Sequence, residues 1–214
     1  MKQPNLIQFL MQPKNWWLPL LIIFTISMAG VVMIGTHTYT EAPPIPNFVG
    51  PDGKKIFTSE DIMKGQGVFQ KYALMEYGSM FGDGAYRGPD YSAEALHLTV
   101  EYMTKYYGES NNSKSEDPTI QQYGISEMVK REIKANHFSQ IDNSVVLTNA
   151  QVFAAQALSE YYIKVFTTTN SEQSFKPQGY LTDKNEIREL SAFFFWSSLG
   201  LRSRATRKKL QLHA

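Results

Sequence analysis

The feature that most constrains this chain is a long apolar run close to its N-terminus. No Asp, Glu, Lys or Arg occurs between Asn15 and Thr40, and Trp16 to Gly35 reads WWLPLLIIFTISMAGVVMIG. Twenty residues of α-helix extend about 30 Å, the thickness of the hydrocarbon core of a bilayer. The two tryptophans that open the run are typical of a membrane interface. We therefore expect a membrane-spanning helix over residues 16–36.

The charges on either side of this run predict its orientation. Lys2 and Lys14 precede it without any acidic residue, and the acidic residues begin with Glu41 beyond it. The positive-inside rule then puts residues 1–15 in the cytoplasm and the main domain on the periplasmic, extracytoplasmic side of the inner (cytoplasmic) membrane. A cleaved signal peptide is the alternative. The run is longer than a typical signal core and its flank lacks an A-x-A cleavage site, which favours a retained anchor.

The sequence after the apolar run is expected to form a spacer and one helical domain. Three prolines in EAPPIP end the helix, so residues 37–46 are interpreted as an extended, proline-rich spacer. The domain spans residues 47–189, and its apolar spacing is mostly that of helices. Signals that start helices occur at Thr58, at Asp90 or Ser92, at Pro118 and at Thr148. Only residues 143–150 suggest a short extended piece, which predicts a mainly α fold with long loops.

Composition excludes several classes of function. The chain has 21 basic and 20 acidic residues, which is unlike a strongly basic nucleic-acid-binding protein. It has no cysteine, which excludes disulfides, zinc–thiolate sites, thiol catalysis and the C-x-x-C-H attachment of haem c. No common nucleotide-binding or hydrolase motif occurs.

The histidines give little support for a metal site or an acid–base site. The four histidines, His37, His97, His137 and His213, lack partners at metal-site spacing. Glu94 lies three residues before His97, and the two could handle a proton or simply touch on an exposed helix face. No catalytic residue is assigned, and the residues alone indicate a membrane-anchored helical module.

The C-terminal end differs in composition from the rest. Leu190 to Leu201, LSAFFFWSSLGL, begins like a second membrane helix, but twelve residues of helix extend only about 18 Å. Five of the 21 basic residues follow in residues 202–214. The stretch 190–201 is either an interfacial helix lying on the membrane or a second membrane helix that is interrupted.

The stretch from Gly65 to His97 is the most specific part of the sequence. It reads GQGVFQKYALMEYGSMFGDGAYRGPDYSAEALH and resembles the N-terminal region of quinol-dependent nitric oxide reductases, the single-chain members of the haem–copper oxidase superfamily. The EAPPIP spacer, the pair Tyr161-Tyr162 and the segment LSAFFFW agree with the same family. The resemblance covers roughly residues 10–196.

The resemblance implies a fold, an activity and one metal site. It implies a domain similar to cytochrome c without haem c, in a respiratory enzyme of denitrification that reduces nitric oxide to nitrous oxide with electrons from quinol. In relatives with a separate cytochrome subunit, backbone carbonyls of the glycine-rich segment lie near a calcium ion, and these carbonyls map onto Gly84 and Tyr86. Carbonyl oxygen is a suitable ligand for calcium. Asp83 stands where the family commonly has histidine, so a histidine-specific role is not carried over.

The resemblance ends after Trp196. The family continues with membrane helices whose side chains bind haem b and a non-haem iron, and SSLGLRSRATRKKLQLHA is unlike that continuation. We therefore expect a chain truncated, or frame-shifted, before the catalytic membrane domain, with residues 202–214 as a basic tail outside the family.

Two functions remain open. In the first, the chain is the N-terminal part of a nitric oxide reductase. It is inactive alone, anchors the enzyme and covers its haem-containing membrane domain. Alternatively, it is a non-catalytic, membrane-anchored interaction module that docks onto a separate respiratory chain. The expected partners are the lipid bilayer, the haem-containing domain and, through that domain, quinol, but no nucleic acid.

Overall fold

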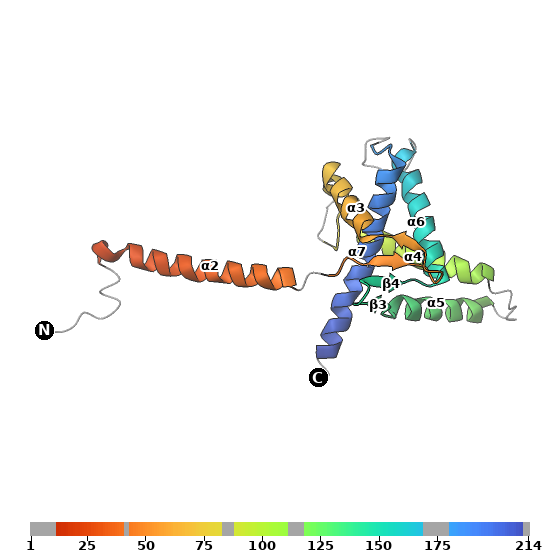
Figure 1. Ribbon diagram of the computed structural model, residues 1–214, viewed down its shortest axis with the longest axis horizontal. Coiled ribbons are helices and arrows are strands. Elements are labelled where there is room, and N and C mark those ends of the chain that lie inside the picture. Colours follow the sequence, from red (N-terminus) through yellow and green to blue (C-terminus); the bar gives the residue numbers. More distant parts are fainter. Residues whose placement is uncertain (1–11, 41–42, 83–87, 111–117, 169–179, 212–214) are drawn as a thin grey trace. The chain divides into compact units, whose positions relative to one another are not determined.

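The structure, a computed structural model, divides the chain into two compact units (Figure 1). The first unit is Met1–Pro43 and the second is Pro44–Ala214. The described residues are 12–40, 43–82, 88–110, 118–168 and 180–211. They are mainly helical, which confirms the fold class expected from the sequence, and the second unit adds a small sheet.

The first unit consists of one long helix with a short 3-10 turn before it. The turn η1 spans Pro13–Asn15, and α2 spans Trp17–Thr40 without a buried residue. Within the part of the chain that the structure describes, Pro13–Thr40 is the one stretch long and apolar enough to cross a membrane. A helix that is apolar on all sides needs an apolar environment on all sides. The apolar helix that the sequence predicts is therefore present, and it ends at Thr40 rather than at residue 36.

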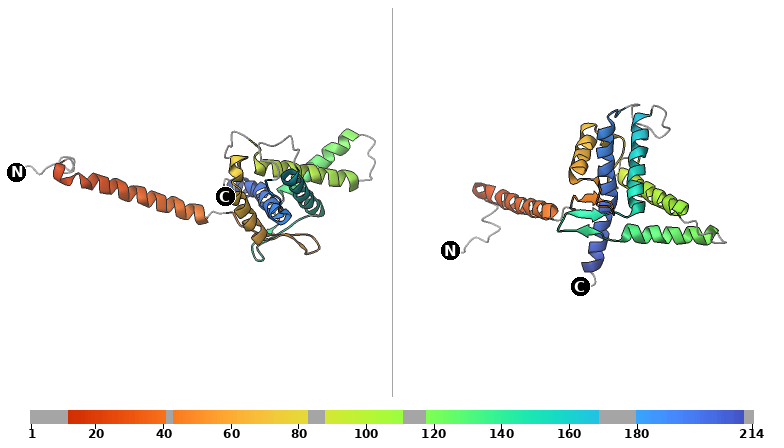
Figure 2. Two further views of the ribbon diagram at one scale, coloured as in Figure 1. Left: turned by 90° about the horizontal axis from the view of Figure 1, so that it is seen from above. Right: turned by 45° about the vertical axis from the view of Figure 1, so that its right-hand side comes forward.

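The described part of the second unit is a group of helices with α7 at its centre (Figure 2). These helices and one 3-10 turn are α3 (Ser59–Lys71), η2 (Leu74–Glu76), α4 (Tyr91–Ser110), α5 (Pro118–Lys134), α6 (Asn149–Thr167) and α7 (Lys184–Gln211). Helix α7 lies between α3 and α6 and also packs on α4. A separate, smaller apolar cluster joins α5 to α4 and α6 around Met103 and Val129.

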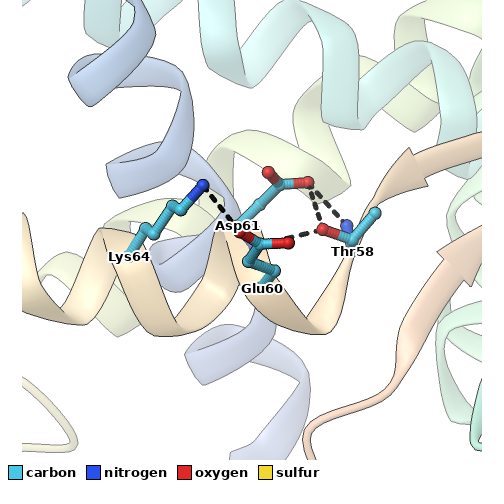
Figure 3. A network of polar contacts seen from close by, with 4 residues as sticks. All are labelled: Thr58, Glu60, Asp61 and Lys64. Carbon is cyan, nitrogen blue, oxygen red and sulfur yellow. Dashed lines mark hydrogen bonds and ion pairs between the residues drawn. The ribbon is translucent and has the colours of Figure 1, made fainter.

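The starts of α3 and α6 show why the sequence places helices there. The Thr58 hydroxyl accepts a hydrogen bond from the Asp61 backbone N–H at 3.1 Å, and the Asp61 carboxylate accepts one from the Thr58 backbone N–H at 2.8 Å (Figure 3). Glu60 and Lys64 add an ion pair on the next turn. Thr148 forms the same reciprocal cap at the start of α6. Both caps satisfy backbone N–H groups that a helix start leaves without partners, and both confirm the sequence-based expectation.

A small sheet was not expected from the sequence. Its strands are β1 (Asn47–Val49), β2 (Lys55–Phe57), β3 (Phe138–Ser139) and β4 (Ser144–Val146), in the order β2-β1-β4-β3. Strands β1 and β4 are parallel, and the two outer pairs are antiparallel. Only β4 falls in the stretch 143–150, where a short extended piece was expected, and the other three strands are an addition to the mainly α fold. Strands of two or three residues are too short to show an alternating pattern.

Aromatic side chains form the centre of the second unit. The rings of Tyr91 and Phe194 are stacked with centroids 4.7 Å apart, and Tyr162 contacts Phe194 at 5.0 Å. Phe195 packs edge-on against Phe48 of β1 at 5.2 Å. Helix α7 therefore joins α4, α6 and the sheet in the larger of the two apolar clusters.

The core extends beyond residue 189, where the sequence predicts the end of the domain. Helix α7 is continuous from Lys184 to Gln211, and the side chains from Leu190 to Phe195 are buried inside the domain. The core thus continues past residue 189, at least to Ser198. A helix lying on the membrane would expose its phenylalanines to lipid, so the interfacial alternative does not hold for these residues.

Candidate functional site

The glycine-rich segment is the part of the domain with the strongest prior expectation of function. Gly84 and Tyr86, the residues expected to offer carbonyls to calcium, lie outside the described residues, as does Asp83. The calcium site therefore stays a prediction. The structure does describe the residues on both sides, up to Gly82 and from Gly88 onward. The contacts of these residues place the two ends of the segment in the domain.

Asp90 holds the two ends of this segment together. One carboxylate oxygen accepts hydrogen bonds from the Ser79 hydroxyl at 3.0 Å and the Gly82 backbone N–H at 2.5 Å. The other oxygen accepts from the Ala93 backbone N–H at 2.9 Å, which caps the start of α4. Of the two caps that the sequence allowed for this helix, Asp90 is therefore the one used. The same carboxylate fixes the start of α4 and holds Ser79 and Gly82 beside it.

Two glycines at the base of this loop are required by close packing. A Cβ added at Gly88, whose φ is +94°, would lie 1.9 Å from the Tyr77 carbonyl oxygen. A Cβ added at Gly78 would lie 2.4 Å from the ring of Tyr91. The prediction that this segment needs unusual backbone angles or a close approach is confirmed for these described positions.

The loop is attached to α7 at the point where the chain enters the domain. The Phe81 backbone N–H donates to the Ser92 hydroxyl at 3.2 Å, and Ser92 donates to Ser197 of α7 at 3.1 Å. The Phe81 ring lies edge-on to Trp196 at 6.5 Å. The Trp196 indole N–H donates to the Pro44 carbonyl at 3.0 Å, and Pro44 is the first residue of the domain.

The turn between β3 and β4 lies at the same place. The Asn143 side-chain amide donates to the Ile45 carbonyl at 3.0 Å, and the Asn47 backbone N–H donates to the Asn143 carbonyl at 2.9 Å. We call the surface around Pro44 and Ile45 the entry face. It consists of Phe81, Trp196 and the turn 140–143, and it carries the described ends of the glycine-rich loop.

Glu94 of α4 makes tertiary contacts with α6 rather than an acid–base pair with His97. The Glu94 carboxylate accepts hydrogen bonds from the Tyr161 hydroxyl at 3.0 Å and the Tyr162 hydroxyl at 3.2 Å, which ties α4 to α6. Burial raises the pKa of Tyr162, and the charge of Glu94 raises that pKa further. His97 is exposed. Glu94 was expected either to handle a proton with His97 or to touch it on an exposed helix face. Its main role in the structure is different, because its carboxylate accepts hydrogen bonds from two tyrosines of α6.

No other described side chains gather into a metal centre. His137 is exposed like His97, and among the described residues no group of three or more His, Cys, Asp or Glu could hold a metal ion. Backbone carbonyls, such as those expected from Gly84 and Tyr86, are a different class of ligand and are unaffected by this observation.

The fold and the site define the class of protein to which the chain belongs. It is a mainly helical domain, with a small sheet, that follows an apolar helix. Residues 46–211 match the family model of the cytochrome c-like domain of NorB, a nitric oxide reductase subunit. This match covers most of the 214 residues, and the chain belongs to that family. No curated protein matched the chain. The family match includes residues 202–211, a range expected from the sequence to be a tail outside the family.

The likeness to cytochrome c raises the question of whether the residues fit a haem c. Covalent attachment needs cysteine thiols, and the sequence contains none. His97 and His137 lie on the surface, so neither reaches the core as an axial ligand. The stacked rings of Tyr91 and Phe194, with Tyr162 beside them, pack the centre of the domain directly against one another. The described residues do not fit a haem c site.

Proposed function

We propose that this chain supplies the N-terminal part of a quinol-dependent nitric oxide reductase. Helix α2 anchors it in the inner membrane with residues 1–15 in the cytoplasm, and the domain from Pro44 onward lies on the periplasmic side. The domain covers the outer surface of the membrane part, which would carry haem b and non-haem iron. That part supplies the reduction of nitric oxide to nitrous oxide, and this chain contributes anchoring, positioning and cover.

The observation that carries this proposal is where the family-like segment lies in the domain. Its described flanks, Ser79–Gly82 and Gly88–Ser92, are hydrogen-bonded to each other and to Ser197 beside the entry face. The entry face is where the chain arrives from the apolar helix α2, so it is the natural side to meet a membrane-embedded partner. The match to the NorB cytochrome c-like domain over residues 46–211 supports the same assignment.

The calcium expected at Gly84 and Tyr86 belongs to this proposal. A short loop whose ends are closed by Asp90 can turn several carbonyls toward one point, as calcium coordination by backbone oxygen requires. The ion would then lie at the entry face, between the domain and the haem-bearing part. Loss of Asp90 would release the Gly82 end of the loop and weaken calcium retention without removing a ligand.

The experiment is to purify the affinity-tagged chain from its native membranes in mild detergent, in a background without other nitric oxide reductases. We expect a haem b spectrum in the purified sample, quinol-driven loss of nitric oxide, and bound calcium by elemental analysis. A folded, membrane-bound chain that carries no haem would contradict the proposal and favour the non-catalytic interaction module.

A matched pair of variants tests the loop specifically. Asp90→Ala should lower the calcium content and the recovery of haem with the chain. Asp52→Ala should leave both unchanged, because Asp52 is exposed in the β1–β2 turn, where its carboxylate accepts a hydrogen bond from the Lys54 backbone N–H. Equal behaviour of the two variants, with both chains folded, would contradict the role given to the loop.

A further inference from the structure

We infer that the entry face carries an apolar rim, Phe81, Ile141 and Trp196, which lies in the headgroup layer of the same bilayer that holds α2. This inference depends on anchoring by α2 and not on the identity of any respiratory partner. It assigns a lipid-contacting surface to the domain itself, in addition to the helix. The glycine-rich segment beyond Gly82 is the part of the entry face that the proposed function gives to the haem-bearing partner, and the rim beside it is the part that meets lipid.

The first observation is exposure of large apolar side chains at one place. Ile141 is 96% exposed at the tip of the β3–β4 turn, and Phe81 is 43% exposed. Trp196 is partly buried between Phe193 and Phe81. Single exposed apolar residues are ordinary on protein surfaces. These three are unusual because hydrogen bonds and ring contacts place all of them around the first residues of the domain.

The second observation is the length of chain between the helix and the rim. Helix α2 ends at Thr40, and Pro44, which accepts the hydrogen bond from Trp196, follows four residues later. Four residues of extended chain span at most about 14 Å. Whatever the arrangement of the two units, the covalent chain keeps Pro44 within that distance of the end of α2. The headgroup layer at the end of a spanning helix is therefore the nearest surface for the rim to meet.

The third observation is the backbone of Phe81. Its φ is +60°, in the left-handed region that favours glycine and that a bulky side chain rarely adopts. Hydrogen bonds from the backbone N–H groups of Phe81 and Gly82, to Ser92 and Asp90, hold the chain in this conformation. Strain of this kind persists where the surroundings fix it and often accompanies a functional surface. Here it directs a phenylalanine ring outward beside Trp196.

The chemistry of the rim also limits how deep it can lie. Asp142 is exposed directly next to Ile141, and a carboxylate is costly inside the hydrocarbon core. Tryptophan prefers the interface, where the ring is in an apolar layer and the N–H can bond; in this domain the N–H bonds to Pro44. The rim is therefore an interfacial contact and not a second membrane insertion.

The test uses the full chain in vesicles of phosphatidylcholine and phosphatidylglycerol, with brominated phosphatidylcholine as the fluorescence quencher. Replacing Trp16 and Trp17 with phenylalanine leaves Trp196 as the single tryptophan of the chain. In the same background, Trp196→Phe is combined with either Ile141→Trp or the control Met75→Trp. Met75 is 69% exposed, so the control site is open to solvent.

The control site, Met75, lies far from the entry face, near the N-terminal end of α7. Met75 follows Tyr72, whose hydroxyl donates to Glu186, and Glu186 precedes Trp196 by ten residues, or about 15 Å of helix. Because an interfacial segment is buried about 5–10 Å, we expect quenching of Trp196 and of Ile141→Trp to be at least about twofold stronger than that of Met75→Trp.

Two outcomes would overturn the inference. One is equal quenching of Ile141→Trp and Met75→Trp in folded chains that sediment with the vesicles, because the domain would then show no preferred face. The other is failure of the chain to sediment with vesicles at all, which would also remove the anchor. The first outcome leaves the proposed function untouched, whereas the second also contradicts the anchoring by α2. The link to haem and nitric oxide is tested separately by copurification.

A second pair of variants tests the rim without moving the tryptophan. Phe81→Ser combined with Ile141→Ser should reduce quenching of Trp196 at least about twofold, since little apolar side chain would remain to hold the face in the interface. Met75→Ser combined with Met63→Ser removes two exposed apolar side chains elsewhere on the domain and should leave it unchanged. Unchanged quenching in the first variant, with the domain folded, would overturn the inference.

Discussion

A single added methyl group on α3 should separate two roles of glycine in this domain. Gly65 faces α7, and a Cβ at this position would lie 2.0 Å from the Glu189 carbonyl oxygen and 2.9 Å from the Phe193 Cβ. Gly67, two residues later in the same helix, has nothing within 4 Å of such an atom. Gly65→Ala and Gly67→Ala therefore make the same chemical change, one against the backbone of α7 and one in open space.

The structure sets the sign and size of both effects. Ordinary contact begins at 3.4 Å, so at Gly65 the backbone of α7 would have to move by more than 1 Å, and it cannot rotate away as a side chain could. Overpacking of this kind typically costs about 1–3 kcal/mol. Replacing an exposed helical glycine with alanine typically stabilises by roughly 0.5–1 kcal/mol. For a chain of this size, 1 kcal/mol shifts Tm by about 2–4 °C, so Gly65→Ala should lower Tm by about 2–12 °C and Gly67→Ala should raise it by about 1–4 °C.

The assay is thermal unfolding in detergent, followed by near-ultraviolet circular dichroism. Changes in this signal report the packed aromatic rings of the domain, because a detergent micelle keeps α2 folded and the contribution of Trp16 and Trp17 therefore stays constant. Gly67→Ala corrects for the gain in helix propensity that both variants share. If Gly65→Ala were as stable as Gly67→Ala, α3 and α7 would not approach each other as described, and the reasoning from their contact would be wrong.

Three further changes test other parts of the fold. Thr58→Ala removes the hydroxyl that accepts the Asp61 N–H at the start of α3 and should cost about 1 kcal/mol, measured as a lower urea midpoint with an unchanged slope. Phe194→Ala empties a fully buried site in the aromatic core and should cost about 3–5 kcal/mol, seen as loss of the near-ultraviolet signal at a much lower temperature, with Phe194→Leu as the milder control. Hydrogen bonds from Lys71 and Tyr72 lower the pKa of Glu186 below its ordinary value, so its contribution is present above that ordinary value and is lost as the pH falls through the lowered pKa. Wild type should therefore have a slightly larger free energy of unfolding than Glu186→Gln at neutral pH and lose this advantage on acidification. A difference in free energy of unfolding that did not change with pH would contradict this assignment.

The features that sequence predicted correctly are those decided by nearby residues. The caps at Thr58 and Thr148 each depend on residues three positions apart, and Pro118 begins α5 as expected from its own geometry. The apolar helix α2 follows from composition alone, since no charged residue interrupts it. These signals are local, so no tertiary information was needed to read them.

The features that sequence missed depend on residues far apart in the chain. Strand β1 pairs with β4 across almost one hundred residues, and each strand has only three residues in which a pattern could appear. The hydrogen bond from Ser92 to Ser197 crosses 105 positions. Asp90 was recognised as a helix cap, but its second role in closing the glycine-rich loop has no signal in the sequence.

The segment LSAFFFW shows why an apolar run is ambiguous between a membrane and a core. A helix that is apolar on several sides can be surrounded by lipid or by other elements of the same domain, and periodicity alone does not distinguish these environments. Here α3, α4 and α6 surround the first half of α7, and β1 contacts it through Phe48 and Phe195. The surroundings, rather than the segment itself, decide that these residues are core.

Because α7 lies at the centre of the domain, its position determines where the residues of the entry face lie. Successive residues of α7, Trp196 and Ser197, bond to Pro44 and to Ser92, while Phe194 and Phe195 are fixed in the core. A shift of α7 along its axis would therefore move the rim and the end of the glycine-rich loop together, because both are hydrogen-bonded to the same turn of the helix. Close-packed cores resist gradual deformation, so such a shift would require repacking around Phe194. The domain thus presents the rim and the described end of the loop, Phe81 and Gly82, on one surface whose position is set by α7.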